Sequence, residues 1–414
     1  MKFYKAIRRL TIISSVLFAI PALVQAQLSL DGELRPRTEY RNGYRTVRTA
    51  DMDPAFFTSQ RARLTLQYKT DLYKIKVAGQ DVRTWGEVAQ LQDNPNVNIH
   101  EVWAQLKVTD AMDLKLGRQE LIYDDHRLLG SVNWTQQARS HDALVVKVDN
   151  NNFKLDLGAA YNQEAQNVIG NTYTMNNYKV LSYLWLHKKM DAFNISVIGI
   201  TDGFQVTDAT NFRYTYGTHL AYNKDAFNAS GSIYLQNGDD NMRTDISAWM
   251  YAVKAGYNFG SFGLTAGYDY LSGGSVNDNN PQRNVFNTLY ATNHKFYGNM
   301  DYFLNVPNDT QLGGLQDIYL KATYTASEKT TLSLTYHNFA LAEEVSATSS
   351  LDKGLGAEFD FNLSHSFSDD IALKMGYSLL SSTDSMERIK GVPGAESTQH
   401  WGWVMLSVTP SFIK

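Results

Sequence analysis

The segment Arg61-Ala62-Arg63-Leu64-Thr65-Leu66-Gln67-Tyr68-Lys69 decides the fold, because apolar and polar residues alternate strictly along its second half. In an extended strand successive side chains point to opposite faces, so one face of this segment is apolar and the other is cationic or polar. The same alternation recurs at 101–108 and 212–222. These segments are longer than the typical strand of about 5–6 residues. They match the roughly 9–11 tilted residues that cross a bilayer.

Two kinds of connection alternate along the chain. Short turns are predicted at 70–71, 109–111, 149–151, 188–191, 224–225, 258–261, 327–329 and 367–369. Long polar loops are predicted at 41–55, 85–96, 121–138, 163–176, 202–210, 237–244, 272–313, 341–352 and 384–396. These connections separate eighteen strands. An even strand number, with short periplasmic turns and long extracellular loops, is typical of a bacterial outer-membrane barrel.

The composition agrees with this pattern. The chain holds 25 Tyr and 19 Phe, yet its mean hydropathy is −0.35, as expected when only every second residue faces lipid. After residue 26 no apolar run approaches the roughly 20 residues of a membrane helix. The predicted fold is all-β, a transmembrane antiparallel β-barrel of about 18 strands. A large secreted β-propeller or sandwich is the alternative that composition alone leaves open.

The first 26 residues have the features of a secretory signal peptide. Four basic residues precede an apolar stretch from Leu10 to Leu23, and Val24-Gln25-Ala26 reads as a cleavage site. We therefore divide the chain into a signal peptide, 1–26, and a barrel, 27–414, in the outer membrane of a Gram-negative cell. The sequence has no cysteine, which excludes disulfides, thiolate metal sites and a lipoprotein anchor. Its net charge of −4 argues against a nucleic-acid partner.

Arginine is concentrated in the first third of the barrel. Eleven of the fifteen arginines after residue 26 lie before residue 140. Alternation predicts that Arg35, Arg37, Arg61 and Arg63 face the lumen, and a lipid-facing arginine would cost roughly 2–4 kcal/mol. Further members of the predicted pore lining are Lys74 and Lys107. Rings of arginine or lysine are the expected device for anion selectivity, because the planar guanidinium can bind both oxygens of a carboxylate.

A structural role for the same arginines is the alternative. Lumenal guanidinium groups also brace a barrel when they pair with carboxylates on neighbouring strands. The acids that lie close enough in sequence to do so are Glu33, Glu39, Asp81, Glu101 and Glu120. The two roles are compatible, since a braced wall with an excess of cations still attracts anions.

The densest polar cluster carries a family resemblance. Gly117-Arg118-Gln119-Glu120-Leu121 is followed by a Leu-Gly step at 129–130 and by Trp134-Thr135-Gln136-Gln137-Ala138-Arg139-Ser140. This stretch resembles the alginate export family of outer-membrane porins, and 294–303 and 315–320 resemble later elements of that family. The resemblance implies a monomeric, eighteen-stranded barrel with an arginine-lined constriction for a polyuronate such as alginate.

The same resemblance implies roles for individual residues. Arg118, Arg127 and Arg139 would lie at or near the constriction, with Asp124 and Asp125 holding them in place. Glu101 and Glu120 are further supporting acids. Strict alternation with Leu114 and Leu116 turns Arg118 outward, so an inward Arg118 requires a bend or bulge at Gly117.

Other functions have weaker sequence support. Asp124-Asp125-His126 has acids and a base for hydrolysis, but no converging partner stands out, so we predict no enzyme, no catalytic residue, no metal site and no cofactor. The predicted partners are outer-membrane lipid, an anionic saccharide or carboxylate solute, and periplasmic export machinery. A general diffusion porin, or a barrel that acts through its loops as a receptor or structural protein, remains the alternative. The segment 272–313 either extends a strand pair or folds into the mouth as a constriction.

Overall fold

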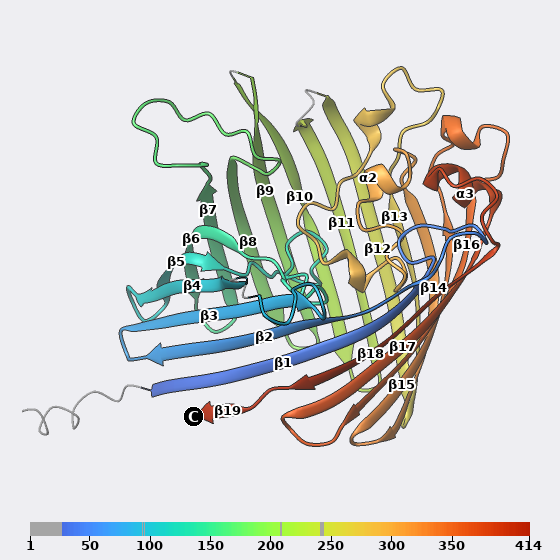
Figure 1. Cartoon of the computed structure of the whole chain (residues 1–414). Helices are drawn as coiled ribbons and strands as arrows, with labels where there is room; N and C mark the ends of the chain where they lie inside the picture. Colours follow the sequence, from blue (N-terminus) through green and yellow to red (C-terminus); the bar gives the residue numbers. More distant parts are fainter. Residues whose placement is uncertain (1–26, 93, 95, 208, 241–243) are drawn as a thin grey trace, which may run out of the picture.

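The computed structural model describes residues 27–414 except 93, 95, 208 and 241–243. The expected signal peptide lies outside the described residues. The strands form one antiparallel sheet in which each pairs with its neighbours in the chain and β18 pairs back with β1, closing the barrel (Figure 1). β19 continues β18 along the edge of β1, so the barrel has eighteen staves, as predicted.

The strands have the following bounds: β1 Gln27–Asn42, β2 Ala55–Lys69, β3 Tyr73–Thr84, β4 Val97–Lys107, β5 Met112–Gln119, β6 His141–Asp149, β7 Phe153–Tyr161, β8 Val180–Met190, β9 Phe193–Val206, β10 Ala209–Lys224, β11 Phe227–Asp239, β12 Asp245–Phe259, β13 Phe262–Leu271, β14 Leu315–Ser327, β15 Thr330–Ala340, β16 Gly354–Ser366, β17 Ile371–Ser382, β18 Thr398–Val408 and β19 Ser411–Ile413. The helices are short: η1 Pro281–Asn284, η2 Asn293–Lys295, α2 Val306–Asp309, η3 Ser346–Thr348 and α3 Asp384–Lys390. Among the described residues no helix is long and apolar enough to cross a membrane.

Alternation sorts the side chains as the sequence predicts. On β2, Leu64 is 57% exposed on the outer surface, whereas Arg61 is 1% exposed and faces inward. Aromatic pairs such as Tyr68–Tyr73 and Phe262–Tyr324 lie at the short-turn ends of their strands, where a barrel meets the membrane interface. The outer face is therefore apolar and the inner face polar over the height of the membrane.

One predicted loop is wrong. The segment 202–210 is not a long connection, because β9 runs to Val206 and β10 begins at Ala209, and these two residues are paired. The polar residues between Phe204 and Phe212 suggested a loop in the sequence. In the structure Phe204 belongs to β9 and Phe212 to β10. Strands β9 and β10 therefore stay paired up to Val206 and Ala209 and project as a hairpin at the end of the barrel that carries the long loops (Figure 1).

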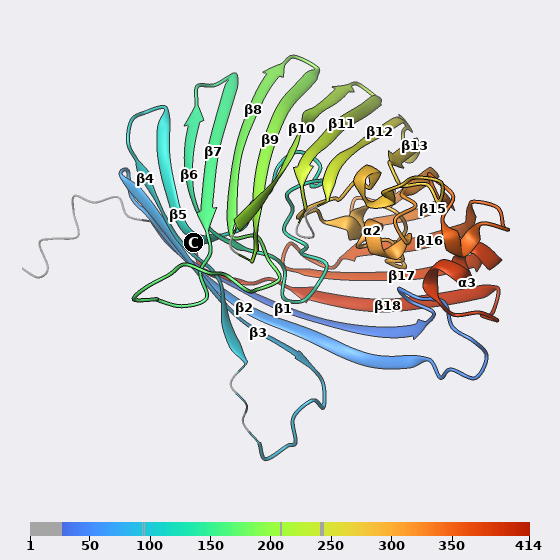
Figure 2. The same cartoon turned by 90° about the horizontal axis from the view of Figure 1, so that it is seen from above.

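Two long connections fold into the barrel instead of away from it. Seen from above, the β5–β6 segment (120–140) and the β13–β14 segment (272–314) lie inside the ring of strands (Figure 2). Phe286, Met300, Tyr302 and Phe303 from the second segment are almost completely buried. Of the two alternatives for 272–313, the structure therefore has the inward-folded one.

The two faces of one strand provide a stability test. On β15, Leu334 is 49% exposed on the lipid side, and the adjacent Ser333 faces the lumen. We expect Leu334→Arg to lower the free energy of unfolding by about 2–4 kcal/mol, the cost of a cation near the bilayer midplane. Ser333→Arg, the matched control, should cost less than about 1 kcal/mol, because its side chain reaches lumenal water. Denaturant titration in lipid vesicles measures both, and equal losses would contradict the assigned faces.

Candidate functional site

The predicted arginine wall exists on β1 and β2. Arg35, Arg37 and Arg61 are buried on the lumenal side, and Arg63 is half-buried beside Gln80 of β3, whose side-chain oxygen accepts a hydrogen bond from the guanidinium at 2.6 Å. Alternation placed these four residues correctly. Strand pairing brings Arg35 directly opposite Arg61, which concentrates like charges at one level of the lumen.

Most of this wall is bonded to the backbone of the β5–β6 segment. Arg35 donates to the carbonyl oxygens of Asn133 and Thr135 at 2.8 and 2.9 Å. Arg37 donates to the carbonyl of Trp134 at 2.7 Å, and Arg61 to that of Gln136 at 3.2 Å. Carbonyl groups inside a barrel need donors because they have left bulk water. The arginines therefore fix the inward segment against the wall.

Two glutamates neutralise part of the wall. Glu33 accepts from Arg61 at 2.7 Å, and Glu39 bridges Arg37 and Arg41 at 2.9 Å each. The bracing role considered from the sequence is therefore present. The wall still carries a cationic excess, since the five guanidinium groups at 35, 37, 41, 61 and 63 meet two carboxylates on β1.

The two predicted lysines, Lys74 and Lys107, lie nearer the short-turn end of the barrel than the arginines do, and Lys115 lies beside them. Lys74 stands 5.5 Å from the ring centre of Trp103, and Lys115 stands 4.1 Å from the same ring. Lys107 forms an ion pair with Asp110 at 2.8 Å in the neighbouring turn. All three follow the lumenal side of β3 to β5, so the cationic surface continues down the barrel from the arginines.

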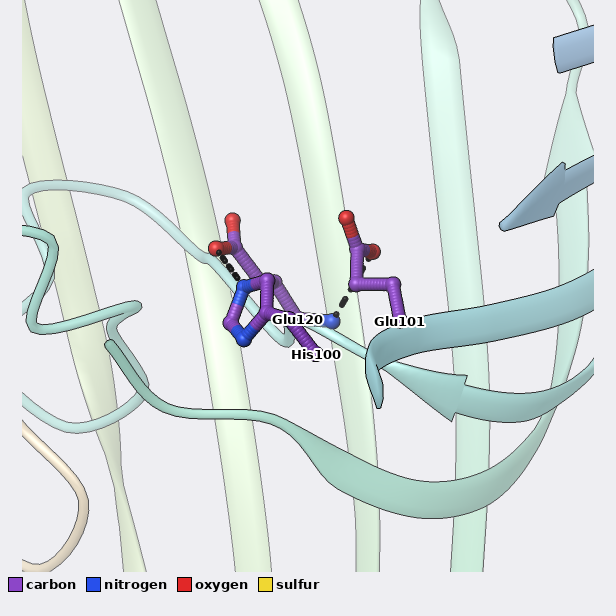
Figure 3. Close-up of side chains that lie close together, drawn as sticks. All are labelled: His100, Glu101 and Glu120. Atoms are coloured by element: carbon purple, nitrogen blue, oxygen red, sulfur yellow. Dashed lines mark hydrogen bonds and ion pairs between the residues drawn. The ribbon is translucent and has the colours of Figure 1, made fainter. Parts of the chain in front are cut away.

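Glu101 and Glu120 lie together with His100 (Figure 3). His100 Nε2 is 2.8 Å from a carboxylate oxygen of Glu120, and the backbone N–H of Glu120 donates to Glu101. This is the one group of three potential metal ligands in the described part of the chain. Glu101 already binds the ammonium of Lys76 and the indole N–H of Trp103, so the cluster functions as an internal network that fills the bulge of β4.

Arg127 is a strut. It binds Asp125 at 2.9 Å and Asp269 of β13 at 2.8 Å, and its guanidinium lies 4.0 Å above the Phe296 ring. Burial raises the pKa of Asp125, but the positive charges of Arg127, His219 and Lys254, together with the hydrogen bond from Arg127, hold that pKa below its ordinary value. Asp125 therefore supports Arg127 as expected. Since Arg127 is 4% exposed, it connects both inward segments without facing open lumen.

Two expectations about this region need revision. Arg118 lies on the outer face, where it pairs with Asp142 at 3.2 Å and lies opposite Val102, so the bulge proposed to turn it inward does not occur. Asp124 binds the indole of Trp185 at 3.0 Å and the Ser196 hydroxyl at 2.6 Å, and in these bonds it holds the wall and no arginine.

Arg139 lies where the two inward segments meet. It donates to the carbonyl of Ala291 at 3.0 Å and so links the two inward segments. Alternation with Leu114 and Leu116 along β5 predicted the outward Arg118 correctly, whereas the family resemblance did not.

The two inward segments dock on each other. Gly130 N–H donates to the Tyr290 carbonyl at 2.9 Å, Tyr290 N–H to that of Leu128 at 2.9 Å, and Thr292 N–H to that of His126 at 3.0 Å. A side chain at Gly130 would meet the Thr292 hydroxyl at 2.3 Å, so only glycine permits this approach. We call the combined structure, residues 120–140 and 272–314, the partition.

The partition separates two cavities. The upper cavity, about 320 Å³, is lined by Arg37, Arg41 and Asp301, and the lower cavity, about 370 Å³, by Lys254 and Lys321 among others. His294 borders the lower cavity, stacks on Trp134 at 4.2 Å and binds Asp301 at 2.6 Å. These contacts join residues far apart in the sequence. In the sequence, the family resemblance of 294–303 indicated that this segment matters.

Glycine 298 anchors the partition to β16. Its φ is +82°, and a Cβ atom there would lie 2.7 Å from the Glu358 carboxylate, which accepts from the Met300 N–H at 2.8 Å. We expect Gly298→Ala to displace this segment, to cost about 1–3 kcal/mol of stability and to raise single-channel conductance. Gly354→Ala, with open space around the new methyl group, is the matched control. Unchanged conductance in a folded Gly298→Ala barrel would show that the segment does not restrict the lumen.

Comparison with known proteins agrees with this architecture. The chain resembles the solved structures of OpdO from Pseudomonas aeruginosa (TM-score 0.63, 12% identity, covering 93% of this chain and 98% of that chain) and OccAB1 from Acinetobacter baumannii (0.65, 13%, 93% and 97%). It also resembles OprD from Pseudomonas aeruginosa (0.63, 11%, 94% and 96%). At such identities the likeness shows the fold. No curated protein matches the chain.

The family model for alginate export matches residues 26–398, which is most of the chain. Strands β1 to β17, the inward segments and the arginine wall described above lie within that range. The chain therefore belongs to the alginate export family, as an outer-membrane β-barrel of the porin type.

Proposed function

We propose that this porin passes anionic saccharides, alginate-like polyuronates among them, or other carboxylate solutes along its cationic lumen. The observation that carries the proposal is the excess of guanidinium over carboxylate groups on β1 and β2, continued by Lys74 and Lys115 below. Charged rings of this sign favour anions in a pore. The partition supports selectivity over free diffusion, because it fills much of the cross-section with fixed groups.

The remaining expectations complete this proposal. Residues 1–26 act as the export signal, and the barrel functions as a monomer surrounded by outer-membrane lipid. The chemistry of the lumen is that of transport, with no catalytic role assigned to any residue. If the direction is export, periplasmic machinery delivers the polymer at the short-turn end.

Ion selectivity is the first test. Arg63 is half-buried, and its guanidinium donates a hydrogen bond to the neutral side chain of Gln80. The charged groups that act on it are Arg61, Glu33, Glu101 and Glu120. We expect the wild-type barrel in a planar bilayer to give an anion-selective reversal potential in a KCl gradient, and Arg63→Gln to reduce that selectivity. Gln67→Ala, a lumenal change on the same strand without loss of charge, is the control. A cation-selective wild-type channel would overturn the proposal.

Solute block is the second test. A trigalacturonate added to the bath should interrupt the current, whereas a neutral trisaccharide of similar size should not. Raising the salt from 0.1 M to 1 M shortens the Debye length from about 10 Å to about 3 Å. We therefore expect the trigalacturonate block to weaken strongly over that range. Equal block by the neutral sugar, or no dependence on salt, would indicate recognition by shape without charge.

A further inference from the structure

A second group of cations lies across the barrel from the arginine wall. Lys254 of β12, Lys321 of β14 and Lys295 of the partition line the same cavity of about 370 Å³, on the short-turn side of the partition. Their sequence positions are far apart. They converge because β12, β13 and β14 are neighbours and the partition folds back over them.

The carboxylates of this cavity are already engaged. Asp269 binds Arg127 at 2.8 Å, and Asp317 binds His337 at 2.9 Å. Asp360 accepts from the Ser378 hydroxyl at 2.5 Å and from the Asn299 N–H at 3.1 Å. The three carboxylates of the cavity therefore bind Arg127, His337, and the hydroxyl and N–H groups of Ser378 and Asn299.

The three ammonium groups, by contrast, have no carboxylate within 4.0 Å among the described residues. Lys295 donates only to the backbone carbonyl of Asp125, at 3.1 Å. Burial lowers the pKa of Lys295; the charge of Asp125 opposes this shift, and the charges of Lys254 and Arg127 add to it. Lys254 and Lys295 line the same cavity. Like charges held together in a half-enclosed space favour an anion between them.

The neutral lining of the cavity suits a sugar ring. Asn228, Asn299 and Asn362 offer amide groups, and Thr265 and Thr323 offer hydroxyl groups, which can bond sugar hydroxyls. The rings of Phe296 and Tyr319 supply apolar faces. A volume of this size lies within the usual range for small-molecule sites, about 300–1,000 Å³.

Resting on the proposed function, we propose that Lys254, Lys295 and Lys321 form a docking site for the carboxylate of a sugar acid on the periplasmic side of the partition. Lysine suits this site because an ammonium binds as a point charge on a flexible stem and does not demand one orientation. Such a site attracts a uronate and releases it again, as conduction requires. The site thus acts as a binding site on the periplasmic side of the pathway, separate from the arginine wall.

The test uses the full barrel in planar bilayers with trigalacturonate added to either side. We expect Lys254→Gln/Lys321→Gln to weaken block from the periplasmic side by roughly tenfold, while block from the extracellular side changes less. Lys374→Gln, which removes a lumenal lysine outside this cavity, should leave periplasmic block unchanged. Lys254→Arg/Lys321→Arg should retain it, and heat-modified gel mobility shows that each variant is folded.

The outcomes separate the two proposals. If the wild-type channel shows no uronate block from either side, the proposed function fails. If the wild type is blocked and the folded double glutamine variant is blocked equally well from the periplasmic side, the lysine site alone is overturned. Loss of block in the Lys374→Gln control as well would also overturn it, because the effect would then reflect lumenal charge in general.

Discussion

The hydrogen bonds between arginine side chains of β1 and β2 and backbone carbonyls of 133–136 are the interaction on which the lumen depends. A segment of irregular backbone that enters a barrel leaves bulk water, and its carbonyl groups must find donors or lose several kcal/mol. A guanidinium group offers five donors in a fixed plane, so one side chain can satisfy two carbonyls and a carboxylate together. Arg35 donates to the carbonyls of Asn133 and Thr135. Arg37 and Arg61 each combine one carbonyl, that of Trp134 or Gln136, with one glutamate.

This dependence gives the arginine wall two functions that cannot be separated by position alone. The same charges that hold the partition set the electrostatic potential of the lumen, because glutamates neutralise only part of them. Removing Arg61 would leave the carbonyl of Gln136 without that donor and the carboxylate of Glu33 without the nearer of its two arginine partners. A substitution of the half-buried Arg63, which bonds Gln80, therefore tests ion selectivity with less disturbance of the partition than a substitution of Arg35, Arg37 or Arg61.

The sequence predicted the barrel well because its main signal is local. A period of two places each side chain on one of two faces, and this rule located Arg35 and Arg63 inside and Arg118 outside. It failed at 202–210, where polar residues within a projecting hairpin imitate a loop. The family resemblance identified the inward segments as important but misassigned Arg118 and Asp124, since their contacts depend on which wall each segment meets. Contacts between residues about a hundred positions apart, such as Arg35 with Asn133, have no local signature.

The contrast between arginine and lysine in this lumen follows from their chemistry. Arginines at 35, 37, 61 and 127 are buried and bonded at several atoms, so they are fixed parts of the structure. Lys254 and Lys321 line open space, and their flexible stems leave the charge free to follow a solute. A pore that passes a polyanion needs both kinds of cation: fixed charge establishes the potential that draws the chain in, and mobile charge exchanges one carboxylate for the next without binding it tightly. Arginine enrichment therefore shows where the lumen is held together by fixed bonds, and in the proposed pathway the lysines opposite lie where the solute has room to move.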